Sequence, residues 1–272
     1  MKELRLRRLR HPETGRVVIC PMDHGVTLGP IKGLTDLELA VERVKRHVDA
    51  IVVHKGQIPV VSRQLGDHPE VAVLVHLNAS VQGASSHPAK VLVAEVEEAA
   101  GLGADGVSVQ LNLGCEGDAD MLATVGRVTR EARLLGLPVL AMTYPQPPGM
   151  SGEATDDIVH VARAAAELGA DLVKVSMPLV PEEVERIVAG AGVPVVVSGG
   201  PYNDDRQAVL DGVRLAMEAG ASGVALGRNV FQDADPQRSA KELYAAVHGQ
   251  SRVRSFEDLD AYPIPDLPRN PF

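Results

Sequence analysis

Eight short apolar runs, each rich in β-branched residues, recur along this chain with helix-like segments between them. Gly, Pro or polar residues bound each run, which is the pattern of strands in successive βα units. The predicted strands are Val17–Cys20, Ala50–Val53, Ala72–His76, Gly106–Val109, Pro138–Met142, Asp171–Val175, Pro194–Val197 and Ser222–Leu226. Because eight such units close into a ring, we expect an α/β fold made of a single (β/α)8 TIM barrel.

The segments between these runs carry apolar residues at helical spacing, which predicts an outer layer of helices. These segments are Leu37–His47, Lys90–Ala100, Ala119–Leu135, Asp156–Leu168, Pro181–Ala189, Asp205–Ala219 and Pro236–His248, with Thr35 and Asp204 as predicted caps. A weak repeat supports the register, since Gly103, Gly169 and Gly220 each follow a helix and lead into a strand. Glycine suits the left-handed conformation that often ends a helix.

The length and composition fit one domain. Its 272 residues are close to the usual size of such a barrel, and we place the barrel at 1–250. Aromatic residues make up only 3% of the chain, so Val, Ala, Leu and Ile must fill the core. The Pro-rich remainder, 251–272, is expected to be an extended C-terminal tail that packs on the barrel or on a neighbouring subunit.

The charge pattern and cysteine content exclude several partners. A net charge of -9 disfavours nucleic acid, whose binding depends on clustered Lys and Arg. The basic cluster Lys2–Arg10 lacks the apolar stretch of a secretory signal, and the chain has no apolar run long enough to cross a membrane. Cys20 and Cys115 form neither a disulfide framework nor a metal-binding spacing. We therefore expect a cytoplasmic protein.

Polar residues cluster where the predicted strands end. In this fold the active site lies at the carboxyl ends of the strands, so these positions are the candidates for chemistry. In strand order they are Asp23-His24-Gly25, His54-Lys55-Gly56, His76, Gln110 with Asn112, Tyr144, Lys174, Ser198-Gly199-Gly200 and Gly227-Arg228-Asn229.

The last two of these loops predict a phosphate site. Loops after strands seven and eight of such barrels commonly bind phosphate through backbone N–H groups. Glycine allows close approach of the backbone, and Arg228 offers a bidentate contact. The alternative is that these glycines only form tight turns.

Lys174 is the most informative single residue because it interrupts the apolar run Leu172–Val175. A buried ammonium is usually paired, so one hypothesis is a structural ion pair with an acid across the barrel. The other is a Schiff-base amine, which must be neutral to attack a carbonyl group. Apolar neighbours and a second cation favour the neutral amine, and Lys55 is the candidate for that cation. Tyr144 and Asp23 would then transfer protons, although either could simply belong to a turn.

A metal site is the rival prediction. His24, His54 and His76 follow three successive strands, and three histidines can hold a catalytic zinc ion. This alternative leaves Lys174 without a role. The remaining histidines are predicted to be ordinary surface or loop residues: His11, His47, His68, His87, His160 and His248.

Six segments together resemble the archaeal-type class I aldolases, and most closely the branch of 2-amino-3,7-dideoxy-D-threo-hept-6-ulosonate synthases. They occur in order between about Arg5 and Gln232. The segments are Pro21–Pro30, Val53–Gly56, Ala141–Pro145, Ala170–Lys174, Val195–Pro201 and Gly223–Gln232.

The resemblance implies a metal-independent enzyme with no cofactor beyond a covalent Schiff base at Lys174. Tyr144 is implied as general acid and Asp23 as its acid/base partner. The implied phosphate-binding residues are Ser198, Gly199, Gly200, Gly227 and Arg228. The implied substrate-binding residues are His24, Gly25, Val26, Thr27, His54, Lys55, Pro145 and Gln146. Family members often form rings, so a homo-oligomer is expected.

By the same resemblance, the enzyme transfers a carbon fragment from a phosphorylated ketose, either dihydroxyacetone phosphate or a hexose-diulose phosphate. The acceptor is an aldehyde such as L-aspartate 4-semialdehyde, in amino-sugar, aromatic or secondary-metabolite biosynthesis. A fructose-bisphosphate aldolase, the metal-dependent enzyme and a non-catalytic sugar-phosphate-binding barrel are the alternatives.

Three segments depart from the family pattern. Val175-Ser176-Met177-Pro178 replaces the usual Thr or Ser followed by Tyr, and Gln146 stands where a basic residue is often found. His76–Ser80 differs from the usual Ser-Gly-Gly-Thr form. Because these changes fall on the substrate side, they leave the identity of the acceptor aldehyde open.

Overall fold

The computed structural model describes residues 1–81, 90–152, 154–178 and 180–249. Eight parallel strands form a closed barrel in the order β1-β10-β9-β8-β7-β6-β3-β2. They are β1 (Val17–Pro21), β2 (Ala50–Val53), β3 (Ala72–His76), β6 (Gly106–Leu113), β7 (Val139–Pro145), β8 (Leu172–Ser176), β9 (Val195–Ser198) and β10 (Gly223–Ala225). The predicted TIM barrel is therefore confirmed. The predicted tail, 251–272, lies outside the described residues.

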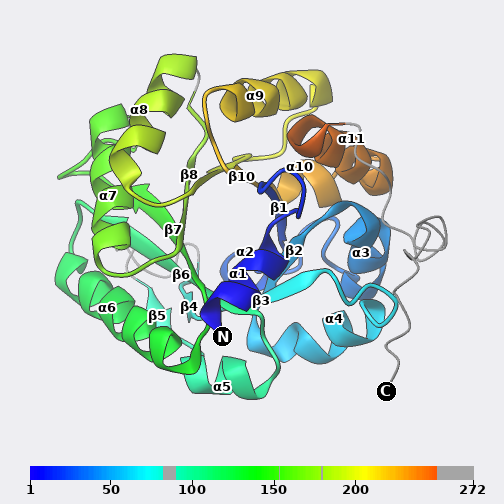
Figure 1. The fold of residues 1–272 in the computed structure, drawn as a ribbon, viewed down its shortest axis with the longest axis horizontal. Helices are drawn as coiled ribbons and strands as arrows, with labels where there is room; N and C mark the ends of the chain where they lie inside the picture. Colours follow the sequence, from blue (N-terminus) through cyan, green and yellow to red (C-terminus); the bar gives the residue numbers. More distant parts are fainter. Residues whose placement is uncertain (82–89, 153, 179, 250–272) are drawn as a thin grey trace, which may run out of the picture.

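Helices surround the barrel, as Figure 1 shows. The outer helices are α3 (Leu37–Val44), α4 (Ile58–Gln64), α5 (Val96–Gly101), α6 (Asp118–Leu135), α7 (Thr155–Glu167), α8 (Pro181–Ala191), α9 (Arg206–Glu218) and α11 (Pro236–His248). Gly103, Gly169 and Gly220 all have positive φ, as their place after a helix predicts. No helix in the described ranges combines the length and apolar character needed to cross a membrane.

Several element boundaries differ from the predictions. Thr35 and Asp204 were expected as caps, but Asp36 accepts a hydrogen bond from Leu39 N and Asp205 accepts one from Ala208 N. The caps therefore lie one residue later. The predicted helix at Lys90–Ala100 is wrong over its first part, where Val91–Leu92 forms β5 and pairs with β4 (Asn78–Ala79).

Strands β6 and β7 are longer than predicted. The sequence placed their ends at Val109 and Met142, because polar residues follow. Pairing continues instead through Asn112↔Tyr144 and Leu113↔Pro145. Gln110 and Tyr144 reach the open carboxyl end of the barrel, whereas Asn112 is buried and accepts a hydrogen bond from Gln110 Nε2 at 2.8 Å. Gln110, Asn112 and Tyr144 are thus held by the sheet rather than by loops.

Two hydrophobic layers define the core. Residues at every second strand position point into the barrel, and the others pack against the helices. The interior layer includes Ile19, Leu74, Leu140 and Leu172, and is closed at the amino end by Leu9. Leu9 belongs to α1 (Lys2–Leu9), a helix that the sequence reading missed and that lies in front of the barrel in Figure 1.

Candidate active site

A cavity of about 460 Å³ opens at the carboxyl ends of the strands. It receives residues from most of the barrel, from the end of β1 round to the loops after β9 and β10. Its lining consists of Pro21, Asp23, His24, Thr27, Leu28, His76, Lys90, Gln110, Met142, Tyr144, Gln146, Lys174, Ser176, Ser198, Gly199, Gly200, Ala225, Gly227 and Arg228. Its volume is in the range of small-molecule sites.

Lys174 lies in the wall of this cavity because of its place in β8. Leu172 belongs to the barrel interior, whereas Val173 and Val175 pack in the layer between strands and helices. With a side-chain period of two, Lys174 must face inward above Leu172. It is 8% exposed. Within the described residues Lys174 forms no ion pair, so the structural pair that the sequence left open is not found there.

Asp23 lies between two histidines just after β1. Its Oδ1 is 3.8 Å from His24 Nδ1, and its Oδ2 is 3.8 Å from His76 Nε2. His76 Nδ1 is 2.8 Å from the Ser108 hydroxyl on β6, which fixes the orientation of the imidazole. The other face of His76 meets the His54 ring edge-on, with 5.4 Å between centroids. Asp23 is therefore held in a compact polar cluster.

Burial and neighbouring charges determine the protonation states of His76 and Asp23 in this cluster. Burial lowers the pKa of His76 to about 4, so its imidazole is neutral at pH 7. Burial raises the pKa of Asp23, but the surrounding His76, His24 and Lys174 outweigh it and hold the pKa below its ordinary value. Asp23 is thus an anion throughout the neutral range.

The predicted phosphate loops adjoin each other across β9 and β10. Asn229 links them, because its Nδ2 donates to Gly199 O at 2.6 Å and its Oδ1 accepts from Asn203 N at 2.8 Å. At two positions in these loops there is no room for a side chain larger than that of glycine. A Cβ at Gly227 would lie 2.6 Å from Pro21 O, and one at Gly199 would lie 2.7 Å from the Leu226 side chain. These glycines keep the backbone of both loops exposed to the cavity.

The structure brings together most of the predicted site residues. Eleven of them line the cavity: Asp23, His24, Thr27, Tyr144, Gln146, Lys174, Ser198, Gly199, Gly200, Gly227 and Arg228. Five others do not appear in its lining: Gly25, Val26, His54, Lys55 and Pro145.

Lys55 lies away from the reacting groups. Its Nζ pairs with Glu98 at 3.0 Å, and the two side chains are 43% and 41% exposed. It follows β2 in a short 3-10 turn that leads outward to α4. The predicted role of Lys55 as a second cation beside Lys174 does not fit this position. His54, by contrast, lies behind the cavity against His76.

The three-histidine metal alternative is not supported by the arrangement of side chains. In the described part of the chain, no three His, Cys, Asp or Glu residues are grouped so that they could hold a metal ion. His24 packs edge-on against Phe231 instead, with 5.4 Å between ring centroids.

Four of the histidines expected to be ordinary surface or loop residues are buried: His11, His47, His68 and His248. His248 Nε2 is 2.9 Å from Asp49 Oδ2, and its ring stacks on His11 with 4.5 Å between centroids. His11, His47 and His248 all pack around Tyr244, whereas His68 Nδ1 is 2.9 Å from Glu70 Oε1. Their helical or loop positions in the sequence gave no sign of that. His87 lies outside the described residues, and His160 is exposed as predicted.

Sequence reasoning missed Lys90 as a cavity residue. It was assigned to the start of a helix, whereas the structure places it just before β5, facing the cavity that also contains Asp23. Burial lowers the pKa of Lys90, with Asp23 opposing that change. The one available signal was a lysine directly before the apolar run Val91–Val93. Ser176, from the segment that departs from the family pattern, also lines the cavity.

A closed parallel barrel with a polar cavity at its carboxyl end defines a TIM-barrel enzyme. The family model of the DeoC/LacD family aldolases matches residues 17–233. The chain belongs to this family, and it is an aldolase-type enzyme.

The relatives point to a narrower group. The chain is 40% identical over 249 residues to 2-amino-4,5-dihydroxy-6-oxo-7-(phosphonooxy)heptanoate synthase of Streptomyces griseus, covering 91% of this chain and 90% of that one. It is 41% identical over 256 residues to 2-amino-3,7-dideoxy-D-threo-hept-6-ulosonate synthase 1 of Archaeoglobus fulgidus, covering 94% and 95%. The resemblance stated from the sequence is thereby confirmed.

A solved structure shows the same fold with its catalytic lysine in a covalent complex. It is an archaeal fructose-1,6-bisphosphate aldolase in which that lysine is bound to the carbinolamine intermediate of the substrate. The TM-score is 0.82 at 27% sequence identity, covering 91% of this chain and 99% of that chain.

Proposed function

We propose that this protein is a class I aldolase or transaldolase in which Lys174 forms a Schiff base with a phosphorylated ketose. The observation that carries this proposal is the inward-facing, 8% exposed Lys174, placed without an ion pair among the described residues in the wall of a polar cavity. The covalent lysine of the archaeal aldolase supports the same chemistry. No metal or organic cofactor takes part in this scheme.

The reaction uses the neighbours of Lys174 as proton carriers. The amine adds to the ketose carbonyl, and loss of water gives an iminium that withdraws electrons from the adjacent carbon. Proton removal there gives an enamine, whose carbon then attacks the aldehyde carbon of the acceptor. Asp23 is the acid/base group and Tyr144 the general acid for these transfers. Both side chains line the same cavity as Lys174.

The donor's phosphate is assigned to Ser198, Gly199, Gly200, Gly227 and Arg228. Open backbone and one guanidinium suit a phosphate group. The names of the Streptomyces and Archaeoglobus relatives, which describe seven-carbon amino acids, favour dihydroxyacetone phosphate or a hexose-diulose phosphate as donor. They likewise favour L-aspartate 4-semialdehyde as acceptor, in amino-sugar, aromatic or secondary-metabolite biosynthesis.

Borohydride trapping tests the proposal. Wild-type protein and Lys174→Met are incubated with dihydroxyacetone phosphate, reduced with borohydride and measured by intact mass. A reduced adduct on the wild type, mapped to Lys174 by peptide mass and missing in the variant, is the expected result. An equal adduct on both proteins, or none on either, would contradict the Schiff base at Lys174.

Fructose-bisphosphate aldolase activity is the second candidate, and the 0.82 TM-score to the archaeal enzyme favours it. Cleavage of fructose 1,6-bisphosphate, followed by a coupled triose phosphate assay, separates the two. We expect slow or no cleavage, because Gln146 and Ser176 give the cavity a lining different from the usual family pattern. A homo-oligomer and a cytoplasmic location stay predictions, and light scattering of the purified protein tests the first.

A further inference from the structure

Lys90 is a charged residue of the cavity that the proposed reaction does not use. Its side chain is partly buried, and its Nζ is 3.2 Å from the Ser80 hydroxyl. Among the described residues it forms no ion pair, in contrast to Lys55 with Glu98. A partly desolvated ammonium with one hydroxyl partner retains donors for an anion.

A small hairpin fixes the position of Lys90. The next residue, Val91, pairs with Ala79 in the antiparallel β4–β5 ladder. The hairpin is attached to the barrel through Asn78, whose Nδ2 donates to Gln110 O at 2.9 Å and whose Oδ1 accepts from Gln110 N at 2.8 Å. Lys90 therefore lines the same cavity as Gln110, and it directly precedes an element tied to β6 by two hydrogen bonds.

The order of strands puts Lys90 across the barrel from the phosphate loops. Its hairpin follows β3, and the ring order β1-β10-β9-β8-β7-β6-β3-β2 places β3 four strands from β9 in either direction. Lys174 lies on one of the two arcs between them, and Asp23 on the other. The cavity thus has Arg228 on the side of the phosphate loops and Lys90 on the opposite side. Lys174 and Asp23 lie between them.

We propose that Lys90, assisted by the Ser80 hydroxyl and the Gln110 side chain, binds the carboxylate of the acceptor aldehyde. This inference rests on the proposed aldolase function. The donor is anchored by its phosphate on the loops after β9 and β10, and the acceptor by its carboxylate on the opposite side. The aldehyde carbon is then presented to the enamine carbon at Lys174.

The step balances without a further reactant. The enamine electron pair forms the carbon–carbon bond, the aldehyde oxygen takes a proton from the general acid to become a hydroxyl, and water hydrolyses the resulting iminium to free Lys174. The Lys90 ammonium, with the Ser80 hydroxyl and the Gln110 amide, suits a carboxylate, whereas the glycine loops and Arg228 already provide the larger donor set that a phosphate takes. Lys90 is accordingly a specificity-determining residue for carboxylated aldehydes.

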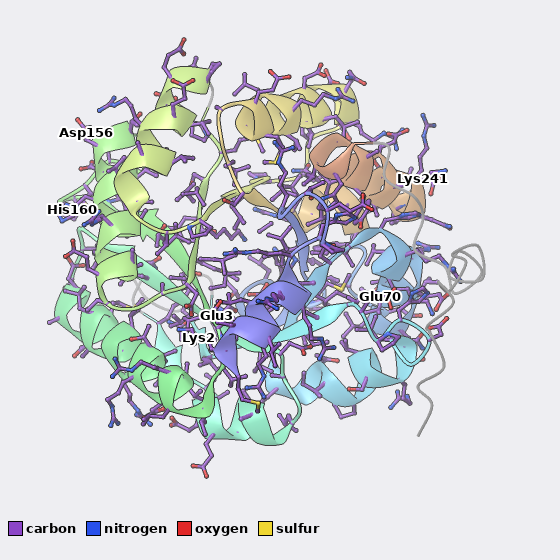
Figure 2. The ribbon with its side chains drawn as sticks, in the orientation of Figure 1. Lys2, Glu3, Glu70, Asp156, His160 and Lys241 are labelled. Atoms are coloured by element: carbon purple, nitrogen blue, oxygen red, sulfur yellow. The ribbon has the colours of Figure 1, made fainter. Side chains whose placement is uncertain are left out.

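The experiment compares matched aldehydes with dihydroxyacetone phosphate as donor. Succinic semialdehyde and butanal have equal carbon number and differ in the carboxylate, and glyceraldehyde 3-phosphate and glyceraldehyde differ in the phosphate. The proteins are the wild type, Lys90→Met, Lys90→Arg and Lys241→Met, a control lysine on the outer face of α11 that Figure 2 labels.

The expected result is selective for charge. Lys90→Met raises the KM for succinic semialdehyde about 10-fold to 100-fold, the range of one charge-assisted hydrogen bond, and leaves butanal within about twofold. Lys90→Arg recovers part of the loss, and Lys241→Met behaves as the wild type. Thermal melts show whether Lys90→Met is folded, and Lys90→Arg keeps the test usable if it is not.

Three outcomes overturn the inference. The first is an equal rise in KM for succinic semialdehyde and butanal in Lys90→Met. The second is a rise in KM confined to glyceraldehyde 3-phosphate, which would make Lys90 a phosphate ligand. The third is a wild type that does not use carboxylated aldehydes. Borohydride trapping separates this failure from that of the proposed function. An adduct at Lys174 with no charge-selective loss in Lys90→Met refutes only the role of Lys90.

Discussion

Charged side chains have different surroundings at the two ends of the barrel. At the carboxyl end, Lys174 and Lys90 face a cavity without ion pairs among the described residues, and Asp23 lies between neutral histidines. At the amino end, three aspartates that directly precede strands each pair with a basic side chain. These pairs are Asp49 with His248, Asp105 with Arg8, and Asp171 with Lys2.

The amino-end aspartates also hold the sheet together. Each accepts a backbone N–H from a neighbouring strand: Asp49 from Val18, Asp105 from Val73 and Asp171 from Val139, at 2.7 to 3.0 Å. Lys2 and Arg8 come from α1, which covers this end, and Figure 2 shows Lys2 in front of the barrel. The paired charges at the amino end stabilise the fold, whereas we expect those at the carboxyl end to act on the substrate. Substitutions at the two ends should therefore separate activity from stability.

Asp23→Asn is expected to have the largest effect. Loss of a group that transfers protons lowers kcat/KM by about 10²-fold to 10⁴-fold. Because the pKa of Asp23 is lowered in the fold, its carboxylate favours folding at pH 7, and the variant should lower the unfolding midpoint by a few degrees at most. Steady-state kinetics and thermal melts measure both. Glu3→Gln, an exposed acid on α1 at the opposite end, is the control and should change neither. A fall in stability as large as the fall in activity would remove the contrast between the ends.

Asp49→Ala should show the reverse. It leaves Val18 N and His248 Nε2 as buried donors without their acceptor, which costs about 2 to 4 kcal/mol of unfolding free energy. Because the cavity lies at the other end, kcat/KM at 25 °C should stay within about twofold of the wild type. Urea unfolding followed by circular dichroism gives the first value. A large loss of activity in protein that is still folded would show that the amino end acts on the site.

The barrel and the place of Lys174, Tyr144 and Asp23 at its cavity could be predicted because both follow from local pattern. Period-two alternation and the strand count place Lys174 inward at the carboxyl end, whatever the details of packing. The amino end could not be predicted in the same way. Asp105 and Asp171 stand in the repeat whose glycines were recognised, but their pairing with Arg8 and Lys2 joins residues far apart in sequence.

The same limit explains the errors at the cavity. Lys90 and Lys55 are both lysines beside apolar runs, and only tertiary structure decides which one faces the cavity. The β4–β5 hairpin turns Lys90 inward, and the 3-10 turn after β2 lets Lys55 reach Glu98. Sequence order alone contains neither contact.

His76→Gln tests the electrostatics of the carboxyl end through pH. The pKa of His76 is about 4 in the fold and about 6.5 in the unfolded chain, so the unfolded state binds more protons between these values. Its contribution to stability is present above pH 6.5 and is lost as pH falls toward 4. The wild type should lose about 2 kcal/mol from this source between pH 7 and 5. His76→Gln should lose correspondingly less, as measured by urea unfolding at each pH.

His160→Gln is the matched control for that experiment. His160 is exposed on α7, as Figure 2 shows, and its replacement should leave the pH dependence unchanged. An unaltered slope in His76→Gln would mean that His76 is not buried as a neutral imidazole. The conclusion that Asp23 is an anion beside neutral histidines would then be wrong.

Lys55→Met is expected to have the smallest effect, and it tests whether Lys55 belongs to the carboxyl-end site. Its ion pair with Glu98 is substantially exposed, and such pairs contribute about 0 to 1 kcal/mol to stability. Because Lys55 lies outside the cavity lining, kcat/KM and borohydride trapping should both stay within about twofold of the wild type. Glu98→Gln serves as the paired control, since it breaks the same ion pair while keeping the lysine. If Lys55→Met lost activity and Glu98→Gln did not, the lysine would turn inward during the reaction, and the active charges would extend beyond the cavity wall.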